Sequence, residues 1–163
     1  SKSIQVKEPT IKLDRETANI YPPATKTVTF TVTVNGVQGN SGVTWTSGNT
    51  KVATVSNGKV TAVGKGTATI TAKANGKLAK AKVTVKDPYA NVSPTSGTIK
   101  VGKTLQLTTN YAPASTGTPS YSSSNKKVAT VDSKGVVKGV KAGTATIIVK
   151  VNGVTAKAEI TVK

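Results

Sequence analysis

The side chains that most often perform catalysis are missing from this sequence of 163 residues. It contains neither histidine nor cysteine, which removes the usual general base, the reactive thiol and the commonest zinc ligands. Serine and threonine are plentiful, but the chain offers no such base to activate them as nucleophiles. We therefore expect a protein that is not an enzyme and that uses no cofactor.

Six carboxylates remain that could bind a cation: Glu8, Asp14, Glu16, Asp87, Asp132 and Glu159. Asp14 and Glu16 are two positions apart, so they share a face if the segment around them is extended. Together with Asp87 they could offer oxygen ligands to calcium. We favour the simpler interpretation, in which there is no metal site and the acids offset a lysine-rich surface.

Positive charge is the strongest signal in the composition. Lysine and arginine total 23 against six acids, which gives a formal net charge of +17 and favours anionic partners. Specific nucleic-acid binding is not expected, because it uses arginine forks and stacking aromatics, and Arg15 is the only arginine. We favour a solvated surface that resists aggregation. The alternative is contact with an anionic cell-wall polymer or glycan, through Lys80, Lys82, Lys126 and Lys127.

The chain carries one pattern twice, in segments 43–85 and 119–162. Each copy has an aromatic residue, then Lys-Val-Ala-Thr-Val, then Gly-Thr-Ala-Thr-Ile, and it closes on a Thr-Val-Lys segment. A match of this length and register indicates a structural repeat. We expect the repeated positions in the two cores to be Trp45, Tyr121, Val52, Val128, Ile70 and Ile147.

Apolar and polar residues alternate with a period of two, which is typical of strands with one buried face. Segment 27–34 alternates in this way without interruption and is predicted as one strand. Asn75-Gly76 and Asn152-Gly153 fit two-residue hairpin turns. With about seven short strands per copy and no helical period, the sequence predicts an all-β protein of two tandem antiparallel sandwiches.

The acid-proline pair Asp87-Pro88 marks the joint between the copies, because proline removes a hydrogen-bond donor and ends the strand. The first module is placed at residues 1–87 and the second at 88–163. Residues 1–8 resemble the end of the first module, so they either open it or close a preceding module of a longer array. The connection is too short to act as a loose tether, and we expect restricted bending between the modules.

The blocks that begin at Trp45 and Tyr121, in the order given above, resemble the bacterial immunoglobulin-like group 2 family (BIG2). The resemblance implies that the two sandwiches are immunoglobulin-like. Such modules occur in tandem in surface-layer (S-layer) proteins, adhesins, envelope enzymes and phage virion proteins. It therefore implies an extracellular place, at a cell surface, in a cell wall or on a virion.

We expect a non-catalytic structural or spacer module whose partners are neighbouring modules of the same chain. Membrane insertion is not expected, because no apolar run approaches the roughly 18 residues that a span needs. The alternative is an adhesin module that recognises a host or cell-wall glycan. It predicts an exposed aromatic or apolar cluster in loop 111–121 or loop 37–43, whereas a spacer predicts polar loops.

Overall fold

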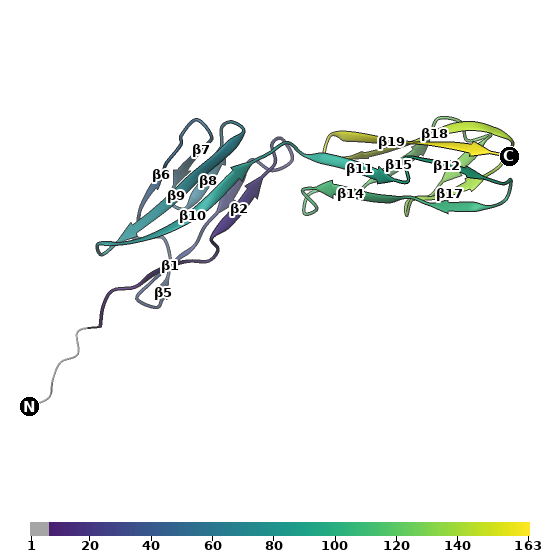
Figure 1. The fold of residues 1–163 in the computed structure, drawn as a ribbon. Helices are drawn as coiled ribbons and strands as arrows, with labels where there is room; N and C mark the ends of the chain where they lie inside the picture. The colour runs from purple at the N-terminus through teal and green to yellow at the C-terminus, as the bar shows by residue number, and fades with distance from the viewer. Residues whose placement is uncertain (1–6) are drawn as a thin grey trace, which may run out of the picture. The chain divides into compact units, whose positions relative to one another are not determined.

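A computed structural model describes residues 7–163, and these residues form nineteen β-strands (Figure 1). No helix that could cross a membrane occurs in this part of the chain. The strands separate into two compact units, with the division after Asp87, and these units are the first and the second module. The prediction for residues 1–8 falls mostly on residues 1–6, outside the described part.

The first module consists of β1 (Ile11–Leu13), β2 (Thr17–Ile20), β3 (Thr27–Thr29), β4 (Val32–Val34), β5 (Val37–Gln38), β6 (Thr44–Ser47), β7 (Ala53–Ser56), β8 (Lys59–Ala62), β9 (Gly66–Ala74) and β10 (Lys77–Val85). Its largest sheet has the strand order β2-β10-β9-β6, and two smaller sheets have the orders β1-β4-β5 and β3-β8-β7. Phe30, Ile70 and Val83 are fully buried where these sheets meet. Alternation directs the apolar side chains of each strand to this one core.

The second module consists of β11 (Tyr89–Ser93), β12 (Ser96–Ile99), β13 (Thr104–Gln106), β14 (Thr108–Ala112), β15 (Ser120–Ser123), β16 (Ala129–Val131), β17 (Val136–Gly139), β18 (Gly143–Val151) and β19 (Val154–Val162). Its sheets have the orders β12-β19-β18-β15, β13-β17-β16 and β11-β14. They enclose a separate core that includes Leu107, Ile147 and Ile160. The prediction of an all-β chain with two tandem sandwiches is confirmed.

The single strand predicted for segment 27–34 is wrong, because the structure divides it at Phe30. β3 pairs with β8, whereas β4 pairs with β1 in another sheet. At the break the Phe30 N–H donates to Gly58 O (2.9 Å), and the Val32 N–H donates to the side-chain oxygen of Asn40 (3.2 Å). These remote partners allow the chain to change sheets without losing its alternation. Breaks of this kind explain why each module has more than the seven or so strands predicted.

The two predicted hairpin turns are confirmed. Asn75 and Gly76 join β9 to β10 with φ angles of 49° and 74°, and Asn152 and Gly153 join β18 to β19 with φ angles of 53° and 77°. Two successive positive φ angles define the turn that matches the twist of an antiparallel hairpin. Asparagine and glycine accept this conformation more readily than other residues.

In each module, an early strand pairs in parallel with the last strand, and this pairing sets the path of the chain. β2 runs parallel to β10, from Thr17 opposite Lys82, and β12 runs parallel to β19, from Ser96 opposite Glu159. Because an early strand and the closing strand point the same way, the chain enters each sandwich at one end and leaves it at the other.

Candidate functional site

The predicted core residues separate into two groups. Val52, Val128, Ile70 and Ile147 are buried. The two aromatics, Trp45 and Tyr121, are only partly buried and pack at the margin of their cores.

The polar atoms of the two aromatics differ in their hydrogen bonding, although such atoms usually have a partner when they are buried. The Tyr121 hydroxyl meets Thr109 Oγ1 at 2.9 Å. By contrast, Trp45 Nε1 is buried and has no hydrogen-bond partner. The Trp45 side chain as a whole lies at the margin of the core, which is a less buried position than the prediction gave it.

Two of the three carboxylates considered as calcium ligands take part in separate interactions. Asp14 Oδ2 accepts hydrogen bonds from Arg15 Nε (2.9 Å) and Nη2 (2.7 Å), and Asp87 forms an ion pair with Lys65. No group of three His, Cys, Asp or Glu side chains that could hold a metal ion occurs among residues 7–163. Asp14, Glu16 and Asp87 therefore do not assemble into a calcium site.

The structural role of Asp14 is to tie β1 to the break in segment 27–34. Its Oδ1 accepts a hydrogen bond from the Thr31 N–H (3.0 Å), and its own N–H donates to Thr31 O (2.9 Å). Burial alone would raise the pKa of Asp14, but the bonds from Arg15 and Thr31 and the charge of Arg15 outweigh it. The pKa of this carboxyl is therefore lower than its ordinary value.

The lowered pKa of Asp14 gives a pH-dependent prediction. The ionised carboxylate stabilises the folded first module above the pKa of the unfolded state, and this contribution is lost as pH falls through the folded-state pKa. We expect Asp14→Asn to lower the free energy of unfolding by about 1 kcal/mol at pH 7 and to have little effect near pH 2. Urea unfolding followed by Trp45 fluorescence measures both values, and an equal loss at the two pH values would contradict the prediction.

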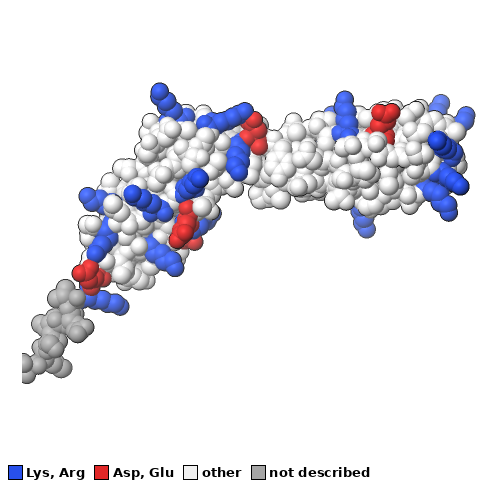
Figure 2. All heavy atoms as spheres, viewed as in Figure 1, with Lys and Arg blue, Asp and Glu red and all other residues white. Residues whose placement is uncertain are grey.

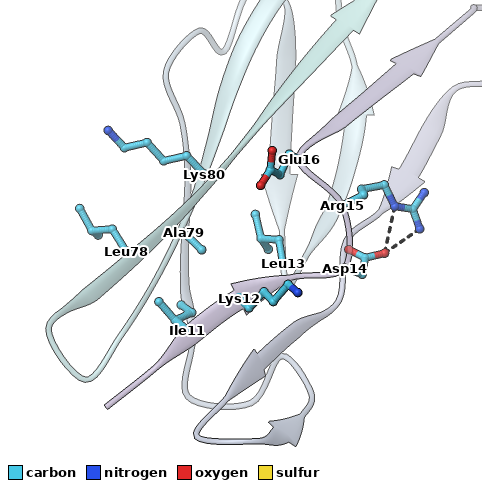
Figure 3. A pocket seen from close by; sticks show the side chains of 9 residues that line it. All are labelled: Ile11, Lys12, Leu13, Asp14, Arg15, Glu16, Leu78, Ala79 and Lys80. Atoms are coloured by element: carbon cyan, nitrogen blue, oxygen red, sulfur yellow. Dashed lines mark hydrogen bonds and ion pairs between the residues drawn. The ribbon is translucent and has the colours of Figure 1, made fainter. Parts of the chain in front are cut away.

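A shallow groove of about 410 Å³ lies beside Asp14, between the segment that contains β1 and the first half of β10 (Figure 3). Its lining residues are Ile11, Lys12, Leu13, Asp14, Arg15, Glu16, Leu78, Ala79 and Lys80. Figure 3 shows Asp14 and Arg15 turned toward each other, so their charges compensate at one side of the groove. The lining offers no histidine, cysteine, serine or threonine. It therefore has no hydroxyl or thiol nucleophile and no histidine base.

The four lysines proposed as polyanion contacts lie in different modules. Lys80 and Lys82 are exposed on β10, where Thr71 and Thr69 stand opposite them on β9. Lys126 and Lys127 are exposed in the connection between β15 and β16 of the second module. The four residues therefore form one pair in each module.

Sequence reasoning missed a group of lysines that the fold places near Lys126 and Lys127: Lys100, Lys103, Lys141 and Lys163. All of them follow or precede strands at the end where the chain leaves the second module. Figure 2 shows positive side chains gathered at this end. The signal available in the sequence was the repeat itself, because Lys103, Lys127 and Lys163 match Lys26, Lys51 and Lys86 of the first copy.

Loops 111–121 and 37–43, in which an adhesin would carry an exposed aromatic or apolar cluster, contain no such cluster. Tyr111, Pro119 and Tyr121 are partly buried and Pro113 is buried. In loop 37–43 the one large exposed apolar side chain is Val37. Single exposed apolar side chains are ordinary on protein surfaces and need no ligand to explain them.

Comparison with known proteins places both modules in one family. The model of the bacterial Ig-like domain (group 2) matches residues 9–85 and again residues 89–162. An uncharacterized protein of Clostridium acetobutylicum is 33% identical over 150 residues, which cover 87% of this chain and 15% of that protein. A 3-O-alpha-D-galactosyl-alpha-L-arabinofuranosidase of Bifidobacterium longum subsp. longum is 55% identical over 51 residues, 30% of this chain and 4% of the enzyme. The chain thus spans a small part of both relatives.

Comparison with solved structures gives matches at low identity. The S-layer protein SbsC is 22% identical with a TM-score of 0.49, and the match covers 96% of this chain and 28% of that one. The I9–I11 tandem of titin is 12% identical with a TM-score of 0.47, and the match covers 94% of this chain and 66% of that one. These likenesses carry no functional information. The two family matches establish that the chain belongs to the bacterial Ig-like domain (group 2) family, with one copy in each module.

Proposed function

We propose that this chain is a non-catalytic structural module that spaces neighbouring domains of a bacterial protein at the cell surface. The observation that carries the proposal is the parallel pairing of β2 with β10 and of β12 with β19. This pairing makes the chain cross each sandwich from one end to the other. Modules with this path can be joined in series, and their partners are then the neighbouring modules of the same chain.

The absence of a reactive site supports a role without catalysis. None of the fully buried side chains among residues 7–163 is polar or charged. The groove beside Asp14 contains no hydroxyl or thiol nucleophile and no histidine base. The arabinofuranosidase activity of the Bifidobacterium longum relative is not assigned to this chain, because the match spans 4% of that enzyme.

The same parallel pairing gives the second module a mechanical role that can be measured. A force along the chain pulls β12 and β19 in opposite directions, so the hydrogen bonds between them share the load. Pulling both handles from one end would load these bonds one at a time. We therefore expect the module to unfold at a markedly higher force in the first geometry than in the second.

Single-molecule pulling tests the mechanical role, with handles attached through engineered cysteines, since the natural chain has none. One variant carries Tyr89→Cys and a C-terminal handle, so the handles lie at opposite ends of the module. The matched control carries Val101→Cys, whose N–H donates to Lys163 O, so both handles lie at one end. The first geometry should give one abrupt event in which about 250 Å of extended chain replaces the length of the folded module, since an extended chain spans about 3.3–3.6 Å per residue.

The outcome that contradicts the spacer role is equally specific. Equal unfolding forces in the two geometries would show that the parallel pair does not bear load. Gradual lengthening without an abrupt event would show that the module does not resist extension.

A further inference from the structure

Six exposed lysines gather at the end where the chain leaves the second module, and we call this surface the lysine end. Its members are Lys100, Lys103, Lys126, Lys127, Lys141 and Lys163. Figure 2 shows positive side chains projecting from this end of the module. Three different connections and the last residue of the chain contribute to it.

Backbone hydrogen bonds hold these connections together. The Val101 N–H donates to Lys163 O (3.1 Å), and the Lys103 N–H donates to Lys100 O (3.0 Å). The Lys141 N–H donates to Val128 O (3.2 Å), directly after Lys126 and Lys127 in the neighbouring connection. The Gly139 N–H donates to Lys103 O (3.0 Å), so the connection between β12 and β13 is held to the end of β17. The six positive charges therefore stand on one ordered surface.

Neither acidic side chain of the second module lies at the lysine end. Asp132 lies in the turn between β16 and β17, where it accepts hydrogen bonds from the N–H groups of Lys134 and Val136. That turn is at the opposite end of the hairpin from Gly139. Glu159 lies within β19, opposite Thr146. All three ion pairs found among residues 7–163 lie in the first module.

The first module provides an internal comparison at its matching end. Lys26, Lys51 and Lys86 recur there, but Tyr21 and Thr50 stand where the second copy has Lys100 and Lys126. Another lysine at that end, Lys65, forms an ion pair with Asp87. The lysine end therefore carries more unpaired positive charge than the matching end of the first module.

A hydroxyl-bearing groove of about 240 Å³ adjoins the lysine end. Its lining residues are Tyr121, Ser122, Ser123, Lys126, Thr130 and Val131. Lys126 belongs to both surfaces, so a polymer held by the lysines could lay a hydroxyl-rich unit along the groove. The serine and threonine hydroxyls can donate and accept hydrogen bonds with such a unit.

We propose that the lysine end binds a linear polymer of polyols joined by phosphodiesters, of the kind found in bacterial cell walls. Lysine ammonium groups are flexible point charges that bind phosphate without requiring a fixed geometry. Several of them on one surface match a chain of regularly spaced phosphates, and binding releases counterions from that chain. Duplex DNA is the less suitable partner, because the surface has no arginine for base edges. The proposal adds a ligand to the proposed spacer role.

The test compares two double variants that change the net charge equally. Lys100→Glu with Lys103→Glu reverses two charges at the lysine end, whereas Lys80→Glu with Lys82→Glu reverses two on β10 of the first module. The probe is purified poly(glycerol phosphate), titrated at about 50 and 200 mM salt. We expect the natural chain to bind at the lower salt. We expect the first variant to lose at least tenfold in affinity and the second to lose less than twofold.

Salt dependence provides a second readout. For a flexible polyanion the slope of log affinity against log salt is about −0.7 per neutralised phosphate. The Lys100 and Lys103 variant loses two such contacts, so the magnitude of its slope should fall by about 1.4. Thermal unfolding of both variants is the control for folding. Unchanged midpoints would show that neither the loss of affinity nor the change in slope arises from misfolding.

Four results would overturn the proposal. Equal losses in the two double variants would show that net charge alone drives binding. Equal binding of the polyol after its phosphates are removed would exclude phosphate recognition. Tighter binding of duplex DNA at the same phosphate concentration would replace the proposed partner with a nucleic acid. Absence of binding at the lower salt would leave the lysines as a solvated surface.

Discussion

Phe30→Ala is expected to unfold the first module selectively, at a cost of about 3–5 kcal/mol in its free energy of unfolding. Phe30 has no exposed surface, and it is the only phenylalanine in the chain. It lies at the break between β3 and β4, where its ring supports two sheets at once. The Arg15 guanidinium carbon lies 5.8 Å from the ring centre, so the substitution also removes a cation–π contact. Alanine would leave a cavity that a module of this size cannot fill without rearrangement.

Trp45 makes this prediction measurable, because the only tryptophan reports on the first module alone. Denaturant unfolding followed by its fluorescence should show a lower midpoint for Phe30→Ala. The matched control is Leu107→Ala, because Leu107 is buried and its N–H donates to Gly135 O as the Phe30 N–H does to Gly58 O. That variant should leave the Trp45 transition unchanged. A shift of the Trp45 transition in the control would show that the modules do not unfold independently.

The architecture could be predicted because the signals for it are local and are repeated. Alternating threonine and valine favour strands, and Asn75-Gly76 specifies its turn within two residues. The break at Phe30 could not be predicted, because its cause is not local. The alternation continues through the break, and the sheet changes because Gly58 and Asn40, far along the chain, provide the hydrogen-bond partners.

The candidate sites show a similar limit. Composition alone shows that histidine and cysteine, which serve in many catalytic sites, do not occur in this chain. Lys126 and Lys127 were recognised as a pair because they are adjacent in sequence. Lys100 and Lys163, which are far apart in sequence, come together only through the pairing of β12 with β19. In an all-β protein, the positions of lysines in the sequence therefore do not show which of them gather on one surface until the pairing of the strands is known.

Gly58, whose carbonyl accepts the hydrogen bond from Phe30 at the break, should tolerate substitution less well than Gly76 in its hairpin turn. Gly58 and Gly76 both follow an asparagine and have nearly the same φ, +80° and +74°. An alanine at either position pays about 1–2 kcal/mol for a left-handed backbone. At Gly76 nothing lies within 4 Å of the added carbon, so that cost is the whole effect.

At Gly58 the added carbon would also meet the side-chain nitrogen of Asn40, and it would lie 2.5 Å from Phe30 O. Neither neighbour can withdraw without loss, because the Asn40 nitrogen donates to Phe30 O (3.0 Å) and to Asn57 O (3.1 Å). Displacing Asn40 would also remove the acceptor of the Val32 N–H. We therefore expect Gly58→Ala to cost about 3 kcal/mol or more, since each lost hydrogen bond adds about 1 kcal/mol to the backbone cost.

Urea unfolding of Gly58→Ala and Gly76→Ala, both followed by Trp45 fluorescence, measures the difference between the two sites. The backbone cost is common to the two variants, so the difference in unfolding free energy isolates the contacts around Asn40. Asn40→Ala in the natural background should reproduce part of this difference, because it removes the same hydrogen bonds without adding a carbon at position 58. Equal costs for the two glycine variants would mean that Asn40 does not hold the break, and that packing of Phe30 alone directs β4 into its separate sheet.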